Sequence, residues 1–275
     1  MNPLKYNGIR TFARNTRIIK IYSTLKRIQE WVILQKYNPV KDNISNVKLN
    51  DINIKMYTES INEYKRVISY KNDSKILNTL LMEIKADDVF WDVGANIGLY
   101  SCLAAASRNN FKAFAFEPED KAYNRLKENI ELNGLTNTFT YKMALADKSG
   151  KLRLKIAEHF ADGNHSLLNS NPDELSIYEE VEIIKGDDLI INDKIDVPNI
   201  IKIDVEGFEY NVLQGLIETL KNKRCRIVLT EVHFSQLNAQ GLNDIPQKIY
   251  NLLTELGFYI KWIDHSHFIA KKIKK

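Results

Sequence analysis

The stretch VFWDVGANIGLY, residues 89–100, decides the fold of this chain. A run of β-branched and aromatic residues ends at an acid, and a glycine-containing turn and an apolar segment of small residues follow. This pattern predicts a β-strand, a tight turn and the start of a helix. Gly94 and Gly98 tolerate positive φ and let the backbone approach a ligand closely. The free N–H groups of the helix start can meet a polar or anionic group.

The spacing of the turn is Asp-x-Gly-x-x-x-Gly. It is neither the three-glycine dinucleotide fingerprint nor a Walker loop, which ends in Gly-Lys-Ser/Thr. An NAD-dependent enzyme is therefore disfavoured. The structural alternative is an ordinary strand-to-helix turn in an α/β domain.

A second apolar run, residues 112–116, ends at Glu117-Pro118. In an open α/β sheet, ligands bind outside the carboxyl ends of the strands. A carboxylate at the end of this second strand can accept hydrogen bonds from both hydroxyls of a ribose. Asp92, the glycine turn and Glu117 therefore predict a nucleoside site.

Five short blocks resemble those of the class I S-adenosylmethionine-dependent methyltransferases and, more narrowly, the FkbM family. They occur in that family's order, and the resemblance extends over residues 77–270. The blocks are DVGANIG (92–98), FEP (116–118), ALADKSG (144–150), IKIDVEGFE (201–209) and EVH (231–233).

The resemblance implies a Rossmann-like fold with a seven-stranded, mostly parallel sheet, helices on both faces and an antiparallel last strand. It implies O-methylation of a sugar, glycolipid or secondary-metabolite hydroxyl, with S-adenosyl-L-methionine as cofactor. Glu117 would hold the ribose and Asp92 would orient the cofactor. Asp147 would meet the adenine amino group, with a plain turn residue as the alternative. The implied cofactor-binding residues are Asp92, Gly94, Ala95, Asn96, Gly98, Glu117 and Asp147.

The candidate catalytic residues Asp204, Glu231 and His233 follow two further predicted strands, residues 200–203 and 227–229. By period-2 alternation, Glu231 and His233 point to the same side. An imidazole with a pKa near ~6.5 suits a general base for an alcohol, and Glu231 or Asp204 could orient it. The same three residue types also bind divalent ions that acidify a hydroxyl; we expect no metal. The structural alternatives are a hydrogen-bonded pair of Glu231 and His233, and a helix cap formed by Asp204 and Glu206.

The first forty residues are basic, with apolar positions at helical spacing. We expect an amphipathic helix that packs on the core with a solvated basic face. Contact with an anionic membrane or partner is the sharper alternative. Two short strands, one on either side of Asn50-Asp51, and a short helix follow. Residues 1–70 are thus expected to form an accessory segment and residues 71–275 the methyltransferase domain.

Composition indicates a globular protein, with 44% hydrophobic and 27% charged residues. The net charge of +4 is mild and does not demand a nucleic acid partner. Cys102 and Cys225 have no metal or redox spacing, so we expect reduced core thiols and a cytoplasmic location. A polar insertion, residues 158–180, contains His165 and Ser166, which are either acceptor-recognition residues or solvated loop.

Two alternative functions stay open. A nucleic-acid methyltransferase has only the basic N-terminal arm in its favour, and no Asn/Asp-Pro-Pro-Tyr/Phe block follows the strand at residues 200–203. A catalytically silent binding module would keep the fold without turnover. The presence of Asp92, both glycines and Glu117 argues against it.

Overall fold

The structure of the chain is a computed structural model that describes residues 37–38, 43–155, 166–167, 178–192 and 195–273. Its elements are, in chain order, β1 (Ile44–Leu49), β2 (Ile52–Tyr57), α3 (Ile61–Ile68), η2 (Ser69–Lys71), α4 (Ser74–Glu83), β3 (Val89–Val93), α5 (Leu99–Ala106), β4 (Lys112–Phe116), α6 (Asp120–Leu132), β5 (Thr138–Tyr141), β6 (Ala144–Ala146), β7 (Gly150–Lys155), β8 (Ser166–Leu167), β9 (Tyr178–Lys185), α7 (Gly186–Ile191), β10 (Ile200–Ile203), α8 (Glu209–Gln214), α9 (Ile217–Lys221), β11 (Ile227–Glu231), α10 (Phe234–Ala239), α11 (Ile245–Glu255), β12 (Phe258–Trp262) and β13 (His267–Lys272).

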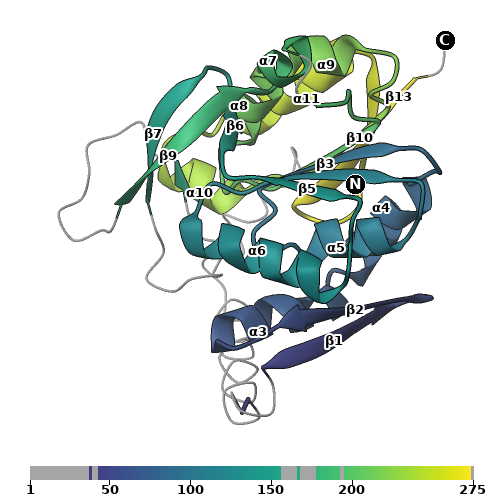
Figure 1. Cartoon of the computed structure of the whole chain (residues 1–275). Helices are drawn as coiled ribbons and strands as arrows, with labels where there is room; N and C mark the ends of the chain where they lie inside the picture. Colours follow the sequence, from purple (N-terminus) through teal and green to yellow (C-terminus); the bar gives the residue numbers. More distant parts are fainter. Residues whose placement is uncertain (1–36, 39–42, 156–165, 168–177, 193–194, 274–275) are drawn as a thin grey trace, which may run out of the picture.

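A seven-stranded sheet forms the centre of the molecule, in the order β12-β13-β11-β10-β3-β4-β5. The strands from β11 to β5 are parallel, and β13 runs antiparallel to both of its neighbours. Helices α5 and α6 lie on one side of the sheet, and α8, α9 and α11 lie on the other (Figure 1). β3 is buried along its whole length, as expected of a parallel strand covered on both faces. The predicted sheet and its antiparallel last strand are confirmed.

The strand-turn-helix predicted from residues 89–100 is present as β3 and α5. The single helix predicted over residues 208–220 is wrong, because the structure divides it into α8 and α9. Gly215 packs against the backbone of β6, where an added Cβ would lie 1.8 Å from the Ala146 oxygen. The Asp187 carboxylate then accepts hydrogen bonds from the N–H groups of Glu218 and Thr219, so it caps a new helix start. Sequence reasoning also missed the short helix α10.

The described part of the accessory segment packs on α5 and α6 (Figure 1). β1 and β2 form the expected antiparallel hairpin, and α3 is the expected short helix. The buried Asn129 side chain on α6 accepts from Tyr57 N and donates to Ile97 O, both at 2.8 Å. Asn129 thereby links the hairpin to the glycine turn, and apolar residues of the hairpin belong to the core of the main domain. The division at residue 70 stays a prediction.

Several expectations fall on residues outside the described part. These are the basic helix within residues 1–40, and with it the membrane contact, as well as most of the polar insertion, including His165. Ser166 lies in β8, where its backbone pairs with β7 in a second sheet of order β6-β9-β7-β8. Among the described residues, no helix combines the length and apolar character that crossing a membrane requires.

We predict that Asp187→Ala lowers the free energy of unfolding by about 2 kcal/mol, because a buried carboxylate that accepts three hydrogen bonds at the start of α9 is lost. Urea unfolding followed by circular dichroism measures this change. Asp188→Ala is the matched control, since its side chain is only partly buried and accepts one bond of 3.2 Å from Ser149. Equal losses in both variants would contradict the capping role.

Candidate functional site

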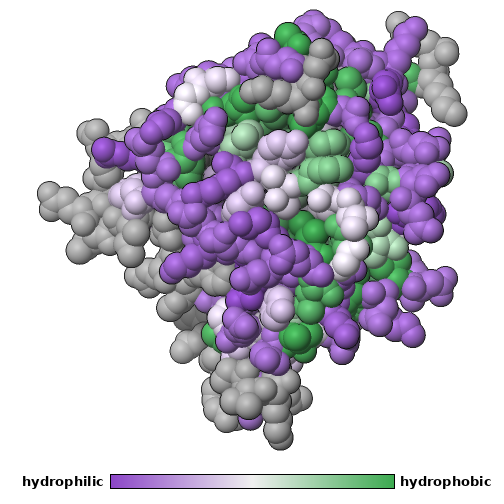
Figure 2. Space-filling view, viewed as in Figure 1, coloured by the Kyte–Doolittle hydropathy of each residue, from purple (hydrophilic) through white to green (hydrophobic). Residues whose placement is uncertain are grey.

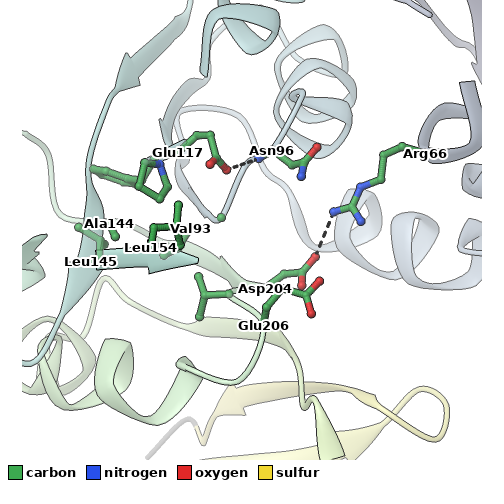
Figure 3. A pocket seen from close by; sticks show the side chains of 13 residues that line it. Arg66, Val93, Asn96, Glu117, Ala144, Leu145, Leu154, Asp204 and Glu206 are labelled. Carbon is green, nitrogen blue, oxygen red and sulfur yellow. Dashed lines mark hydrogen bonds and ion pairs between the residues drawn. The ribbon is translucent and has the colours of Figure 1, made fainter. Parts of the chain in front are cut away.

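A cavity opens at the carboxyl ends of β3, β4 and β10, where a parallel sheet offers its binding site. Figure 3 shows its wall, in which Asn96 and Glu117 lie across from Asp204 and Glu206. Arg66, from the accessory helix α3, reaches the same space and points toward Asp204. The cavity thus joins the glycine turn, the end of β4, the end of β10 and the accessory segment.

The glycine turn forms one wall of the cavity and is held by its own hydrogen bonds. Gly94 N and Ala95 N both donate to Phe116 O at 3.0 Å, and Asn96 N donates to Glu117 Oε2 at 2.8 Å. Gly94 has φ of 75°, and an added Cβ would lie 2.0 Å from Asp204 O. At Gly98 an added Cβ would lie 2.5 Å from Leu126 of α6. Gly94 therefore requires glycine because backbone occupies the Cβ position, and Gly98 requires it because its φ of 90° is rarely adopted by other residues. The N–H groups from Gly94 to Asn96 are used within the protein.

Glu117 lies at the end of β4 with a side chain that is 6% exposed. Its Oε2 accepts from Asn96 N, and its Oε1 accepts from Glu119 N at 2.9 Å. Burial raises the pKa of Glu117 to about 7, although these two N–H groups oppose the shift. Each oxygen keeps lone-pair capacity, so the carboxylate can accept further hydrogen bonds from a ligand in the cavity.

Asp92 lies beneath the glycine turn, and its predicted role in orienting the cofactor stays a prediction. Its side chain is fully buried and lies outside the residues that line the cavity. Ser101 Oγ donates to Asp92 Oδ2 at 2.6 Å, and Lys202 Nζ lies 3.1 Å from Oδ1. In this structure the Asp92 carboxylate interacts with side chains of the protein, through a hydrogen bond from Ser101 and an ion pair with Lys202.

Asp147 is exposed on the turn after β6, and it is not among the residues that line the cavity. Ala144 and Leu145, a few positions earlier, do line it. The adenine contact of Asp147 stays a prediction.

The predicted catalytic residues come together around His233. Its Nε2 lies 3.6 Å from both Asp204 Oδ1 and Glu231 Oε2. Two further carboxylates that the sequence prediction left out are closer. Glu206 Oε2 lies 3.1 Å from Nε2, and the fully buried Glu209 lies 2.7 Å from Nδ1. Both belong to the DVEGFE block, so their nearness to a strand end was the signal that could have found them.

Carboxylates on both sides of the ring change how His233 titrates. Burial lowers its pKa, but the hydrogen bond with Glu209 and the charges of Glu209, Asp204 and Glu206 outweigh burial and raise the pKa to about 10. The premise that His233 titrates near ~6.5 is therefore not met in this structure. Its role as a general base stays a prediction.

The two acids of the His233 cluster that line the cavity, Asp204 and Glu206, titrate far apart. Burial raises the pKa of Asp204, but the charges of Lys202, Arg66 and His233 outweigh burial and lower it to about 2. Burial raises the pKa of Glu206 to about 7, although the charge of His233 opposes the shift. Near neutral pH, Asp204 is ionised while Glu206 can take up or release a proton.

The same cluster has the composition of a divalent-cation site. Asp204, Glu206 and His233 each offer one ligand atom, and these atoms all lie within 4.8 Å of one another. Carboxylate and imidazole ligands suit several divalent metals. Glu206 takes the place that the sequence interpretation gave to Glu231 in this alternative set.

The strand order and the site at the strand ends define a class I methyltransferase fold. Within that class, a sequence profile described as the Methyltransferase FkbM domain matches residues 92–260. This match covers more than half of the chain, and the chain belongs to that family.

Two characterised relatives and one solved structure show the range of similarity. The chain is 29% identical over 235 residues to the hexuronic acid methyltransferase AglP of Haloferax volcanii, covering 86% of this chain and 89% of that protein. It is 26% identical over 181 residues to the 31-O-demethyl-FK506 methyltransferase FkbM of Streptomyces tacrolimicus, covering 55% and 68%. The crystal structure of methyltransferase FkbM from Methylobacillus flagellatus KT is 16% identical with a TM-score of 0.46, covering 68% and 44%.

We predict that His233 stays protonated up to about pH 10 and that Glu209→Gln moves its pKa down, because the strongest carboxylate partner loses its charge. Titration of the imidazole ¹⁵N resonances measures the pKa of His233. The resonances of the five histidines are assigned with variants that each lack one histidine. Glu131→Gln, at an exposed position of α6 away from the cluster, is the matched control and should leave the pKa of His233 unchanged. Titration of wild-type His233 near pH 6.5 would contradict the cluster.

Proposed function

We propose that this methyltransferase moves a methyl group from S-adenosylmethionine to an oxygen of a sugar, glycolipid or secondary metabolite. The observation that carries the proposal is the buried Glu117 carboxylate at the end of β4, held by two backbone N–H groups and open to the cavity. The relatives support the acceptor class, because one is named for hexuronic acid and one for an oxygen position of FK506.

The residues that line the cavity have the chemical character needed to bind S-adenosylmethionine. Glu117 would accept hydrogen bonds from the ribose hydroxyls, and the turn from Gly94 to Gly98 would pack beside the ribose and the methionine part. Apolar side chains of Phe116, Leu145 and Leu154 also line the cavity and suit the face of a purine. When bound, S-adenosylmethionine supplies an activated methyl group.

The chain's own task is to align the acceptor oxygen and to take up its proton. Glu206 is the group we propose for the proton, because its carboxylate lines the cavity while His233 lies behind it. Glu206 Oε2 is held by His233 Nε2 and by the amide of Gln236. Asp204 stays ionised beside it, and Glu231 and Glu209 keep the imidazole charged and oriented.

We further propose an acceptor type, a membrane contact and a cellular location for this chain. The acceptor is a small molecule or a glycan. As the alternative to packing on the core, residues 1–40 would contact an anionic membrane surface. A cytoplasmic location is supported by Cys102 and Cys225, which are buried free thiols. We also propose that methyl transfer by this chain needs no metal ion.

We predict that Glu117→Gln weakens binding of S-adenosylhomocysteine by about tenfold or more, because a charged acceptor of hydrogen bonds is lost. Isothermal titration calorimetry measures the affinity, and circular dichroism verifies the fold of the variant. Glu131→Gln, on the exposed side of α6, is the matched control with unchanged affinity. Unchanged affinity in Glu117→Gln would contradict the site.

The same titration has an expected pH dependence. The ribose hydroxyls donate to an ionised carboxylate, and the pKa of Glu117 is raised to about 7. Wild-type affinity should therefore fall as the pH is lowered through about 7 and reach its plateau above it. Glu117→Gln should remove this dependence. A wild-type affinity that is flat from pH 6 to 8 would show that Glu117 does not hold the ribose through its charge.

We predict that Glu206→Gln lowers the turnover of methyl transfer by about 100-fold or more while S-adenosylhomocysteine affinity stays unchanged, because only proton uptake is removed. Release of S-adenosylhomocysteine with a panel of glycoside acceptors measures the rate, with Glu131→Gln as control. Reactions run with EDTA and with added Mg²⁺ show whether Asp204, Glu206 and His233 act without a metal or bind a divalent cation. Turnover that depends on Mg²⁺ would contradict the metal-free form, and cofactor binding without turnover on any acceptor would support the silent module.

A further inference from the structure

A second cavity of about 140 Å³ adjoins the first and extends away from Glu117. The two cavities share Arg66, Asn96 and Asp204 in their walls, while Tyr100 and His267 line only the second. A molecule in the second cavity would lie next to Asp204, and Arg66 stands where the two cavities meet. This geometry suits a subsite for the acceptor beside the cofactor.

Arg66 comes from outside the family match, which begins at residue 92. It lies on α3, whose N-terminus is fixed by a capping box between Ser60 and Glu63. Glu63 is fully buried and also pairs with Arg125 of α6 at 2.5 Å. The helix that presents Arg66 is therefore held firmly to the main domain.

The guanidinium of Arg66 is not saturated by protein groups. Among the described residues, its recorded ion pair is with Asp204 at 3.7 Å, which exceeds hydrogen-bond length. By contrast, Arg125 contacts three carboxylates at 2.5 to 2.7 Å, and Arg226 contacts both oxygens of Asp88 at 2.5 and 2.9 Å. Those two arginines serve the fold, whereas Arg66 holds its donors toward the cavities.

Asp204 has cationic neighbours besides Arg66. Lys202 Nζ and His233 Nε2 each lie 3.6 Å from the same carboxylate. A guanidinium offers five N–H donors in a planar fork that matches a carboxylate, and its charge persists at every relevant pH. Arg66 can thus bind an anionic group of a ligand while remaining near Asp204.

We propose that Arg66 binds a carboxylate of the acceptor, so that the enzyme selects an acidic, carboxylate-bearing sugar over a neutral one. This inference rests on the proposed function and narrows its substrate class. The competing role for Arg66 is neutralisation of the acids in the cavity wall, such as Asp204 and Glu231. That role would affect acidic and neutral acceptors alike.

The test compares p-nitrophenyl β-D-glucuronide with p-nitrophenyl β-D-glucoside, using the full chain and S-adenosylmethionine. The two compounds differ only at C6, which is a carboxylate in the first and a CH2OH group in the second. We expect wild type to prefer the glucuronide. Arg66→Gln should lower kcat/KM for the glucuronide by about 10- to 100-fold through lost charge-assisted hydrogen bonds, mostly in KM, and lower it clearly less for the glucoside. Arg66→Lys should restore part of the loss, and Arg108→Gln, at an exposed position, is the control.

Binding of free glucuronate and of glucose to the complex with S-adenosylhomocysteine, followed by saturation-transfer NMR, gives a second readout that needs no turnover. An equal loss on both acceptors, or no wild-type preference for the acid in rate or in binding, would overturn the inference. Failure of wild type to bind S-adenosylhomocysteine would instead contradict the proposed function. The two failures are therefore distinguishable.

Discussion

The buried ion pair between Lys202 and Asp92 is the constraint on which the site depends. Lys202 on β10 is directly opposite Asp92 on β3, and their side chains are 5% and 0% exposed. Lys202 Nζ also donates to Gly94 O at 2.8 Å, and Ser101 of α5 donates to Asp92. A buried charge is tolerated only with such partners, and removing one would leave the other uncompensated. Two strands, the glycine turn and a helix are thereby fixed to one another.

The cavity follows from this pairing. Asp204 lies two residues after Lys202, at the point where β10 ends, and its backbone oxygen lies against Gly94. Gly94 must therefore be glycine because the neighbouring strand end occupies the space of a side chain. The same turn directs Asn96 N to Glu117. Asp92, the acid of the Asp-x-Gly motif, stabilises the turn through Lys202, which donates to Gly94 O. The acids that line the cavity instead follow the ends of β4 and β10.

Local pattern was enough to predict the parts of this fold that depend on neighbours in sequence. Apolar runs between turns predicted β3, β4 and β10, and parallel strand ends placed Glu117 and Asp204 at one edge of the sheet. Tertiary contacts decided the rest. The break between α8 and α9 arises because β6 passes against Gly215, which no local signal reports.

The composition of the site shows the same limit. Glu231 and His233 are two residues apart, and their nearness could be predicted from strand alternation. Glu209 reaches His233 from 24 positions away, and Arg66 reaches Asp204 from a helix outside the family blocks. The protonation of an imidazole depends on all charges within a few ångströms, so a residue's reference pKa was a poor guide to His233.

Asp204 and Glu206 both lie next to the His233 imidazole, yet their pKa values move in opposite directions. Lys202 and Arg66 keep Asp204 ionised, while burial with fewer cations lets Glu206 hold a proton near neutral pH. Two carboxylates of one motif thus acquire different protonation behaviour from their surroundings, one as a fixed charge and one as a group that can exchange a proton near neutral pH.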